Sequence, residues 1–281
     1  MSKRRLPPEH AWYLYGVATR SEAQNRLPPA TAGVDGAAPV AAIGDGALAA
    51  LVSAVPLAEF AADRVRSLAQ DDAWLGRVAR EHERVVATLQ RRLTIVPARL
   101  FSVYASEDDI VHSLAESEST IVRTLQQLES CDEFEVRLTF DRDVLRKSLS
   151  VSVPEIAQLL QKRTTSSAGR AYLVDRQIAS LLKRHVEDTI KDWSDAAFAE
   201  LRLHAIADGD LTPLRLVEGE SARAAVRRTF LIRRAKQDDF LEAVERAGEL
   251  RPEIKVEYGG PWPPYNFADP AAFEEQENVR G

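Results

Sequence analysis

The chain has 281 residues, 45% of them hydrophobic and 28% charged, which is enough for two domains with cores of their own. Its formal net charge of −6 argues against a general nucleic-acid binder, which needs a basic surface. The single cysteine, Cys131, excludes an intramolecular disulfide and a thiolate zinc cluster, and it fits a reducing compartment. No segment near the start is typical of a secretory signal, so we expect a cytoplasmic protein without a membrane span.

The first part of the chain alternates between strand-like segments and loops. Residues 12–18 are rich in aromatic and β-preferring residues and predict a strand. Residues 25–39 are rich in proline and glycine and predict a long loop. Residues 40–43 and 48–55 then predict a hairpin around the glycine-containing turn at 44–46.

Two helices and a strand are predicted next. Apolar residues at helical spacing indicate a helix over 71–92, with His82 on its apolar face as a hydrogen-bonded core residue. Pro97 interrupts the strand predicted over 94–104 and so places it at a sheet edge. Ser106 is a plausible cap for a second amphipathic helix that continues to residue 128.

A half-exposed strand over residues 134–140 completes this part. The order of elements predicts an α+β domain with a modified ferredoxin-like plan and a sheet that helices cover on one face. We place this domain at residues 1–145 and a helix-rich α+β domain at residues 146–281.

The second domain combines long helices with two strands. Residues 169–203 keep helical spacing as one long helix or two broken ones, and the strand at 222–234 is apolar on both faces, which predicts a central position. The other predicted elements are helices at 154–163 and 237–250 and a strand at 254–258.

The segment Gly260–Phe267 holds three prolines and three aromatics, a composition that excludes a regular helix or a central strand. We interpret it as an extended clamp that docks its aromatic rings on a surface. The predicted clamp residues are Pro261, Trp262, Pro263, Pro264, Tyr265 and Phe267.

No motif in the sequence indicates a catalytic, cofactor-binding or metal-binding residue. Residues 40–49 match a strand followed by G-x-G-x-x-A, but Pro56 breaks the helix that a dinucleotide site would need. Acidic pairs such as Asp108-Asp109 stand near predicted helix starts, where the helix dipole and caps account for them.

Four separated stretches carry a family resemblance. They are Tyr13–Val17, the His82 helix leading to Val96–Arg99, Gly169–Leu173 with Arg176, and Gly260–Phe267. In this order, and across nearly the whole chain, they resemble the gas vesicle protein L and F family. Where that family tends to have phenylalanine followed by glycine, this sequence has Leu100 and Phe101, which suggests a divergent member.

The resemblance implies a non-enzymatic accessory role in gas vesicle assembly, in the cytoplasm or at the vesicle. The implied partners are the small hydrophobic shell protein and other accessory gas vesicle proteins, without nucleic acid, membrane or cofactor. We expect the Pro97 strand and the loop at 25–39 to shield the shell protein. The candidate partner-binding residues are Tyr13, Tyr15, Pro97 and Arg99.

Three alternatives stay open at this point. An enzyme of unknown reaction should show a cleft with convergent polar groups. An RNA-binding ferredoxin-like module should show exposed aromatics among basic residues, which the acidic charge disfavours. A generic scaffold with a ferredoxin-like domain is the third.

Overall fold

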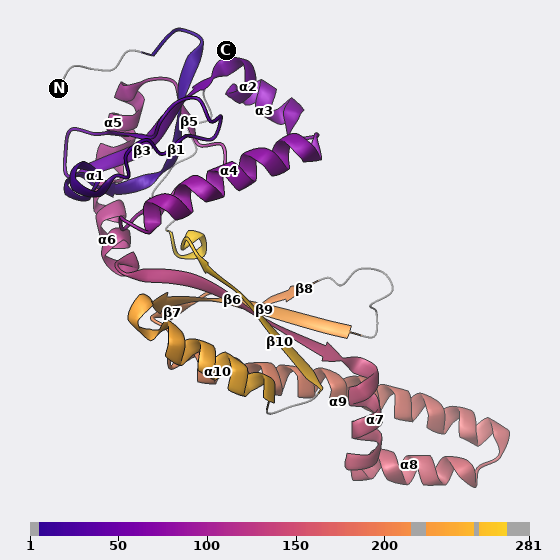
Figure 1. Cartoon of the computed structure of the whole chain (residues 1–281). Coiled ribbons are helices and arrows are strands. Elements are labelled where there is room, and N and C mark those ends of the chain that lie inside the picture. The colour runs from indigo at the N-terminus through magenta and orange to yellow at the C-terminus, as the bar shows by residue number, and fades with distance from the viewer. Residues whose placement is uncertain (1–5, 215–222, 250–252, 269–281) are drawn as a thin grey trace. The chain divides into compact units, whose positions relative to one another are not determined.

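The computed structural model describes residues 6–214, 223–249 and 253–268 of the chain (Figure 1). Two compact units divide the chain, one made of Met1–Glu133 with Pro261–Gly281 and the other of Phe134–Gly260. The sequence placed a domain boundary after residue 145, whereas the units divide inside a continuous strand. A strand shared in this way has no break in its alternating pattern, so composition does not mark the boundary.

The first unit contains an antiparallel sheet in the order β2-β3-β1-β4, and β5 also pairs with β1. Its strands are β1 His10–Thr19, β2 Ala41–Ile43, β3 Leu48–Pro56, β4 Val96–Pro97 and β5 Val103–Tyr104. The strand at 12–18 and the hairpin are confirmed. The strand expected over 94–104 is instead the two short strands β4 and β5, and β4 with Pro97 stands last in the sheet order, as predicted.

Six helices belong to the described part of this unit. They are α1 Arg20–Arg26, α2 Leu57–Phe60, α3 Ala62–Leu68, α4 Asp72–Gln90, α5 Glu107–Glu116 and α6 Glu118–Leu128. The helix over 71–92 is confirmed as α4, which begins where the Asp71 side chain accepts hydrogen bonds from the amides of Ala73 and Trp74. Ser106 caps α5 as expected, but backbone that leaves the helical region at Ser117 separates α5 from α6.

Helices lie on both faces of this sheet, which corrects the expectation of one covered face. The run β1–α1–β2–β3–α4–β4 with this strand order is the ferredoxin-like plan, and α1 and α4 share one core with Tyr13 and Tyr15. On the other face Leu14 and Val17 are also buried, and α5 and α6 contact β3 and β1 there. The near-continuous apolar run of β1 reflects this burial on two sides.

The second unit contains the other sheet, in the order β10-β6-β9-β7, with β8 also paired to β9. Its strands are β6 Cys131–Asp141, β7 Ala207–Asp208, β8 Thr212–Leu214, β9 Arg223–Arg233 and β10 Ile254–Trp262. Its helices are α7 Arg142–Ser152, α8 Pro154–Thr164, α9 Ala168–Arg202 and α10 Gln237–Glu249. The central position of β9 is confirmed, and residues 222 and 250 of the predicted elements lie outside the described residues.

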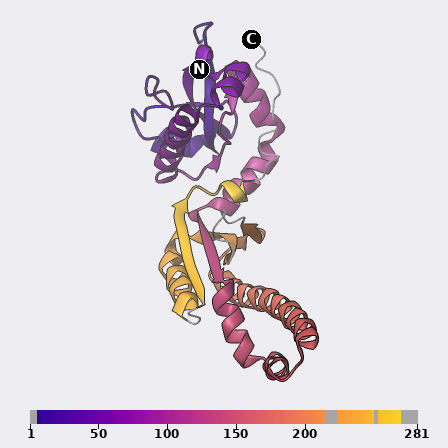
Figure 2. The ribbon, with the colours of Figure 1, turned by 90° about the vertical axis from the view of Figure 1, so that its right-hand side faces the viewer.

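One face of this sheet packs against α9 and α10 (Figure 2). The core joins aromatic rings from the sheet and both helices, with Phe230 between Phe198 and Phe240 at centroid distances of 6.0 and 5.4 Å. The segment at 169–203 forms one helix, α9, of 35 residues. Both sheets are antiparallel and the α+β class is confirmed. Among the described residues, no helix is both long and apolar enough to cross a membrane.

Candidate functional site

Two tyrosines of β1 form the centre of the candidate site in the first unit. Tyr13 and Tyr15 are fully buried, and their ring centroids lie 5.2 Å apart. Both project toward α4 because residues two apart in a strand share a face. The pairing of β1 with β3 shifts between Leu14 and Gly16, so Tyr15 stands at a β-bulge.

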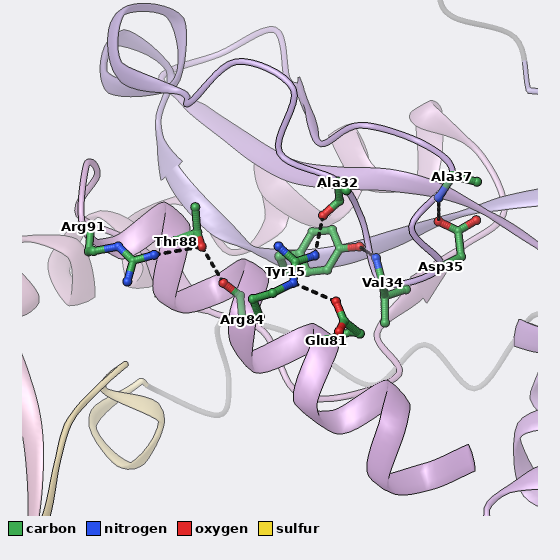
Figure 3. Close-up of polar contacts among 9 residues, drawn as sticks. All are labelled: Tyr15, Ala32, Val34, Asp35, Ala37, Glu81, Arg84, Thr88 and Arg91. Atoms are coloured by element: carbon green, nitrogen blue, oxygen red, sulfur yellow. Dashed lines mark hydrogen bonds and ion pairs between the residues drawn. The ribbon is translucent and has the colours of Figure 1, made fainter. Parts of the chain in front are cut away.

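The Tyr15 hydroxyl holds the loop that connects α1 to β2 (Figure 3). It accepts a hydrogen bond from the Val34 amide at 2.7 Å and bonds the Ser53 hydroxyl at 2.7 Å. A Cβ on Gly33 would lie 2.2 Å from the Ser53 oxygen, so the loop requires glycine there. Burial raises the pKa of Tyr15 to about 12, which keeps the hydroxyl neutral.

Arg84 of α4 makes a second attachment for the same loop. Its guanidinium donates to the Ala32 carbonyl at 3.0 Å and pairs with Glu81 at 2.7 Å (Figure 3). The loop tip turns where Asp35 accepts a hydrogen bond from the Ala37 amide at 3.0 Å. The loop is therefore anchored to both β1 and α4, while Ala37 itself is exposed.

The Tyr13 hydroxyl holds a second exposed segment, the turn between β4 and β5. It accepts a hydrogen bond from the Phe101 amide at 3.2 Å and lies 3.1 Å from Nδ1 of His82. Phe101 has a φ of 68°, and its ring stacks on Trp74 with centroids 5.6 Å apart and planes 2° apart. Phe101 therefore has the left-handed backbone that glycine, expected here from the resemblance, adopts without strain. The stack on Trp74 stabilises the phenylalanine side chain in its place.

His82 lies beneath both tyrosines, as a hydrogen-bonded core residue, which confirms the prediction for it. It is 3% exposed, and its imidazole contacts the rings of Tyr13 and Tyr15 at centroid distances of 5.7 and 5.8 Å. Burial lowers the pKa of His82 to about 4, so the ring is neutral at pH 7. Burial also raises the pKa of the Tyr13 hydroxyl above its ordinary value.

The C-terminal segment packs on the same cluster. Pro263 and Pro264 are buried, and the Tyr265 ring lies 6.3 Å from the His82 ring. Burial and the nearby Glu83 carboxylate raise the pKa of Tyr265, and burial likewise raises the pKa of Glu83.

Asn266 fixes the end of this segment to Glu133 at the start of β6. The Asn266 amide donates to one carboxylate oxygen at 2.9 Å and its side chain donates to the other at 2.5 Å. Because Glu133 is 3% exposed, these two hydrogen bonds satisfy a buried charge. Both residues belong to the first unit.

The structure assigns different places to the predicted partner-binding residues. Tyr13, Tyr15 and Pro97 are buried, whereas Arg99 is exposed on the turn that Tyr13 holds. Tyr13 and Tyr15 are buried because α4 packs on them, and the sequence of residues 12–18 does not reveal this tertiary contact by itself.

The predicted clamp is corrected in two respects. Trp262 is not docked but 43% exposed in β10, and Tyr265–Phe267 form a 3₁₀ turn in place of extended chain. Pro261 lies exposed in the same strand as Trp262, and Phe267 is half-buried. The proline pair brings Tyr265 to His82, so one of the three aromatics makes the central contact.

Sequence reasoning missed Glu83, Glu133 and Asn266. Asn266 stands inside the predicted clamp, and Glu133 is an acidic residue directly before an apolar strand, but no local signal pairs them. Among residues 6–214, 223–249 and 253–268, no three His, Cys, Asp or Glu side chains lie close enough together to hold a metal ion. The cluster's tyrosine hydroxyls position two exposed segments, the loop through Val34 and the turn through Phe101.

Comparisons with known proteins agree with this architecture. The chain is 27% identical to gas vesicle protein L of Streptomyces sp. (strain CB03234), over 94% of this chain and 95% of that protein. It is 25% identical to gas vesicle protein F of the same organism, over 92% and 99%. The crystal structure of GvpF from Anabaena sp. PCC7120 has a TM-score of 0.68 at 18% identity, covering 92% of this chain and 98% of that one.

A second solved structure, GvpF from Microcystis aeruginosa, gives a TM-score of 0.60 at 18% identity and covers 92% of this chain and 99% of that one. At these identities the two structures support the fold alone. The family described as "Gas vesicle synthesis protein GvpL/GvpF" matches residues 11–269. Because that match spans most of its length, this chain belongs to the gas vesicle synthesis protein GvpL/GvpF family.

Proposed function

We propose that this protein is a non-enzymatic accessory protein of gas vesicle assembly, which binds the small hydrophobic shell protein, and other accessory gas vesicle proteins, while the vesicle forms. Its membership of the gas vesicle synthesis family supports a role in this process. The protein would act in the cytoplasm and at the growing vesicle.

A shell subunit with an apolar face and an unpaired strand edge aggregates unless a partner covers it. The observation that carries the proposal is the outer strand β2 with the loop before it. From Gly36 to Gly44 no side chain is charged, and β2 stands at the end of its sheet order opposite to β4. Strand edges are usually protected by charge, so an uncharged edge suits β-strand addition by an apolar partner.

The buried tyrosines contribute by positioning this contact. Tyr15 anchors the loop through Val34, and Tyr13 anchors the turn that carries Arg99 through Phe101. In this proposal Ala37, the outer edge of β2 and Arg99 face the shell protein, and Tyr13 and Tyr15 act through them. The Pro97 strand is a weaker candidate, because Val96 and Pro97 are buried and α6 contacts β4.

The test is co-expression with the small shell protein, followed by sedimentation and pull-down at matched concentration. We expect the shell protein to move from the pellet into a soluble complex. Ala37→Lys and Arg99→Ala should reduce the complex, since a charge at an apolar edge costs binding and Arg99 faces the partner. Ala199→Lys, an exposed site on α9, is the matched control.

A shell protein that pellets unchanged with the wild-type protein would contradict direct shell binding. Equal loss of complex in the control and in Ala37→Lys would contradict the assigned surface. Circular dichroism of each variant separates loss of binding from loss of fold.

A further inference from the structure

The helical hairpin of α8 and α9 in the second unit has no part in the proposed function. The two helices pack through Ile156, Val174, Ile178 and Leu181, and the hairpin extends beyond the sheet of this unit (Figures 1 and 2). Arg163 of α8 pairs with Asp175 of α9 across it. Within this packed hairpin, α9 turns one face toward α8 and another toward solvent.

The solvent face of the first half of α9 is apolar at its tip. Tyr172 is 62% exposed and Leu173 is 64% exposed, although the next residue of the helix, Val174, is buried. Large apolar side chains at this exposure, next to each other, mark contact surfaces more often than single exposed residues do. They belong to the stretch Gly169–Leu173 that the sequence singled out.

Between Tyr172 and Arg184 the same face is basic and lacks carboxylates. Residues three and four apart line one side of a helix, so Tyr172, Arg176, Ala179 and Lys183 form one exposed row, and Leu173, Gln177, Ser180 and Arg184 form the row beside it. Together they span about 18 Å along the axis, at 1.5 Å per residue.

These cations are not neutralised within the described chain. Arg170, Arg176, Lys183 and Arg184 make no ion pair with a carboxylate of any described residue, and Asp175, the one acidic residue between Ala168 and Val186, is engaged by Arg163. In a chain of net charge −6, this segment is a local positive surface.

We propose that this face of α9 binds an acidic amphipathic helix of a protein partner, independently of the shell-protein contact on the first unit. Apolar residues of that helix would pack on Tyr172 and Leu173, and its carboxylates would pair with Arg176, Lys183 and Arg184. The small residues Ala179 and Ser180 in the middle let a helix backbone approach closely.

A protein helix fits this face better than nucleic acid or a lipid surface. The polar residues Gln177 and Ser180 interrupt the face where a membrane-binding helix would continue its apolar side. Nucleic acid and anionic membranes present extended negative surfaces that also meet the rest of an acidic chain, whereas a short acidic helix meets only the local basic row.

The first experiment uses the full-length protein and a fluorescein-labelled 18-residue peptide, with leucines at helical spacing on one side and glutamates on the other. We expect binding by fluorescence anisotropy, weakened about tenfold or more in Tyr172→Ser/Leu173→Ser and in Arg176→Glu/Lys183→Glu. A peptide with lysines in place of the glutamates should bind the charge-reversed variant better than the wild-type protein.

The matched control is Lys191→Glu against Lys183→Glu. Both lysines are exposed on α9 and each change reverses one charge, but Lys191 pairs with Asp195 outside the proposed face. Loss of binding in Lys183→Glu with retention in Lys191→Glu supports the site. Equal effects of both changes, or no binding of the peptide to the wild-type protein, would overturn it.

Two further arms identify the occupant. Vesicles of phosphatidylcholine with phosphatidylglycerol, and a double-stranded DNA oligonucleotide, are offered to the same variants; binding of either that depends on Tyr172 and Lys183 overturns the protein partner. A photo-crosslinking residue at position 172, during co-expression with the other gas vesicle proteins, supports the proposal if it joins an acidic helical segment of one of them. Crosslinks to a second copy of this chain would contradict it.

Discussion

The Tyr265 ring lies against the imidazole of His82, with centroids 6.3 Å apart, although Tyr265 stands at the C-terminal end of the described chain and His82 in the middle of α4. The first unit therefore includes both the start of the chain and its C-terminal segment. The segment adds the buried hydroxyl of Tyr265 and the donors of Asn266 to a core that already contains two acidic side chains, Glu83 and Glu133.

Asn266→Ala tests this attachment. The variant removes the side-chain hydrogen bond to Glu133 and leaves a carboxylate oxygen of a 3% exposed residue without that donor, which should cost about 1–3 kcal/mol of unfolding free energy. Urea denaturation measures the loss. Asn25→Ala is the matched control, because its amide bonds a carbonyl at an exposed site and should cost less than about 0.5 kcal/mol. Equal stability of the two variants would show that the attachment is not stabilising.

His82→Gln tests the burial of a neutral imidazole. The unfolded chain binds a proton near the ordinary histidine pKa of 6.5, whereas folded His82 does so only near pH 4, so the folded state loses stability as pH falls between these values. The wild-type unfolding free energy should fall with a slope of up to about 1.4 kcal/mol per pH unit from this residue. The variant should lack that part of the slope.

The raised pKa of Glu83 acts in the opposite direction, since its contribution is present at low pH and is lost as pH rises through its folded value. Glu83 is present in both proteins, so the difference between them isolates His82. His112→Gln, at an exposed site on α5, is the control substitution. Parallel slopes in wild type and His82→Gln between pH 7 and 4 would contradict the assignment.

Local patterns in the sequence predicted the elements whose residues repeat at a fixed spacing. Helix α4 follows from helical periodicity, and the strand at 12–18 and the hairpin follow from β-preferring residues and a glycine-containing turn, signals that one segment contains by itself. Helix α7 was missed because its apolar stripe is short, with Leu145 buried and Leu149 packed beside it. The strands β7 and β8 are too short to show alternation.

The candidate site was harder to predict because its bonds join distant segments. Tyr15 bonds Val34 and Ser53, and Glu133 bonds Asn266, and no spacing in the sequence encodes these pairs. A family resemblance drew attention to Tyr13 and Tyr15 but did not tell whether they contact a partner or hold the residues that do. Their burial, and the exposure of Arg99, are the basis for proposing that they hold the residues that do.

Tyr15→Phe tests the positioning role. The change leaves the buried amide of Val34 and the fully buried Ser53 hydroxyl without the phenol oxygen, which should cost about 1–3 kcal/mol. Amide hydrogen exchange across residues 32–38 should accelerate, and shell-protein binding should weaken without loss of the fold. Tyr104→Phe is the control, because its hydroxyl bonds the half-buried Ser113, and its loss should stay below about 1 kcal/mol. Unchanged exchange in the loop would contradict the role of Tyr15.

Phe101 offers a test in which glycine and alanine exchange their usual order. Its φ of 68° is strained for a residue with a Cβ by about 1 kcal/mol or more, and its stack on Trp74 opposes that strain. Phe101→Ala loses the stack and keeps the strain, while Phe101→Gly loses both. Both variants should be less stable than wild type, and the glycine variant should exceed the alanine variant by about 1 kcal/mol.

Gln177 on the exposed side of α9 supplies the comparison. In a helix interior glycine is less stable than alanine by about 1 kcal/mol, so Gln177→Gly should unfold more easily than Gln177→Ala. Thermal or urea unfolding of the four variants gives both orders in one experiment. An alanine variant at Phe101 that is as stable as the glycine variant would mean that the turn relaxes to negative φ, and then the Tyr13 hydroxyl would also lose its hydrogen bond from the Phe101 amide.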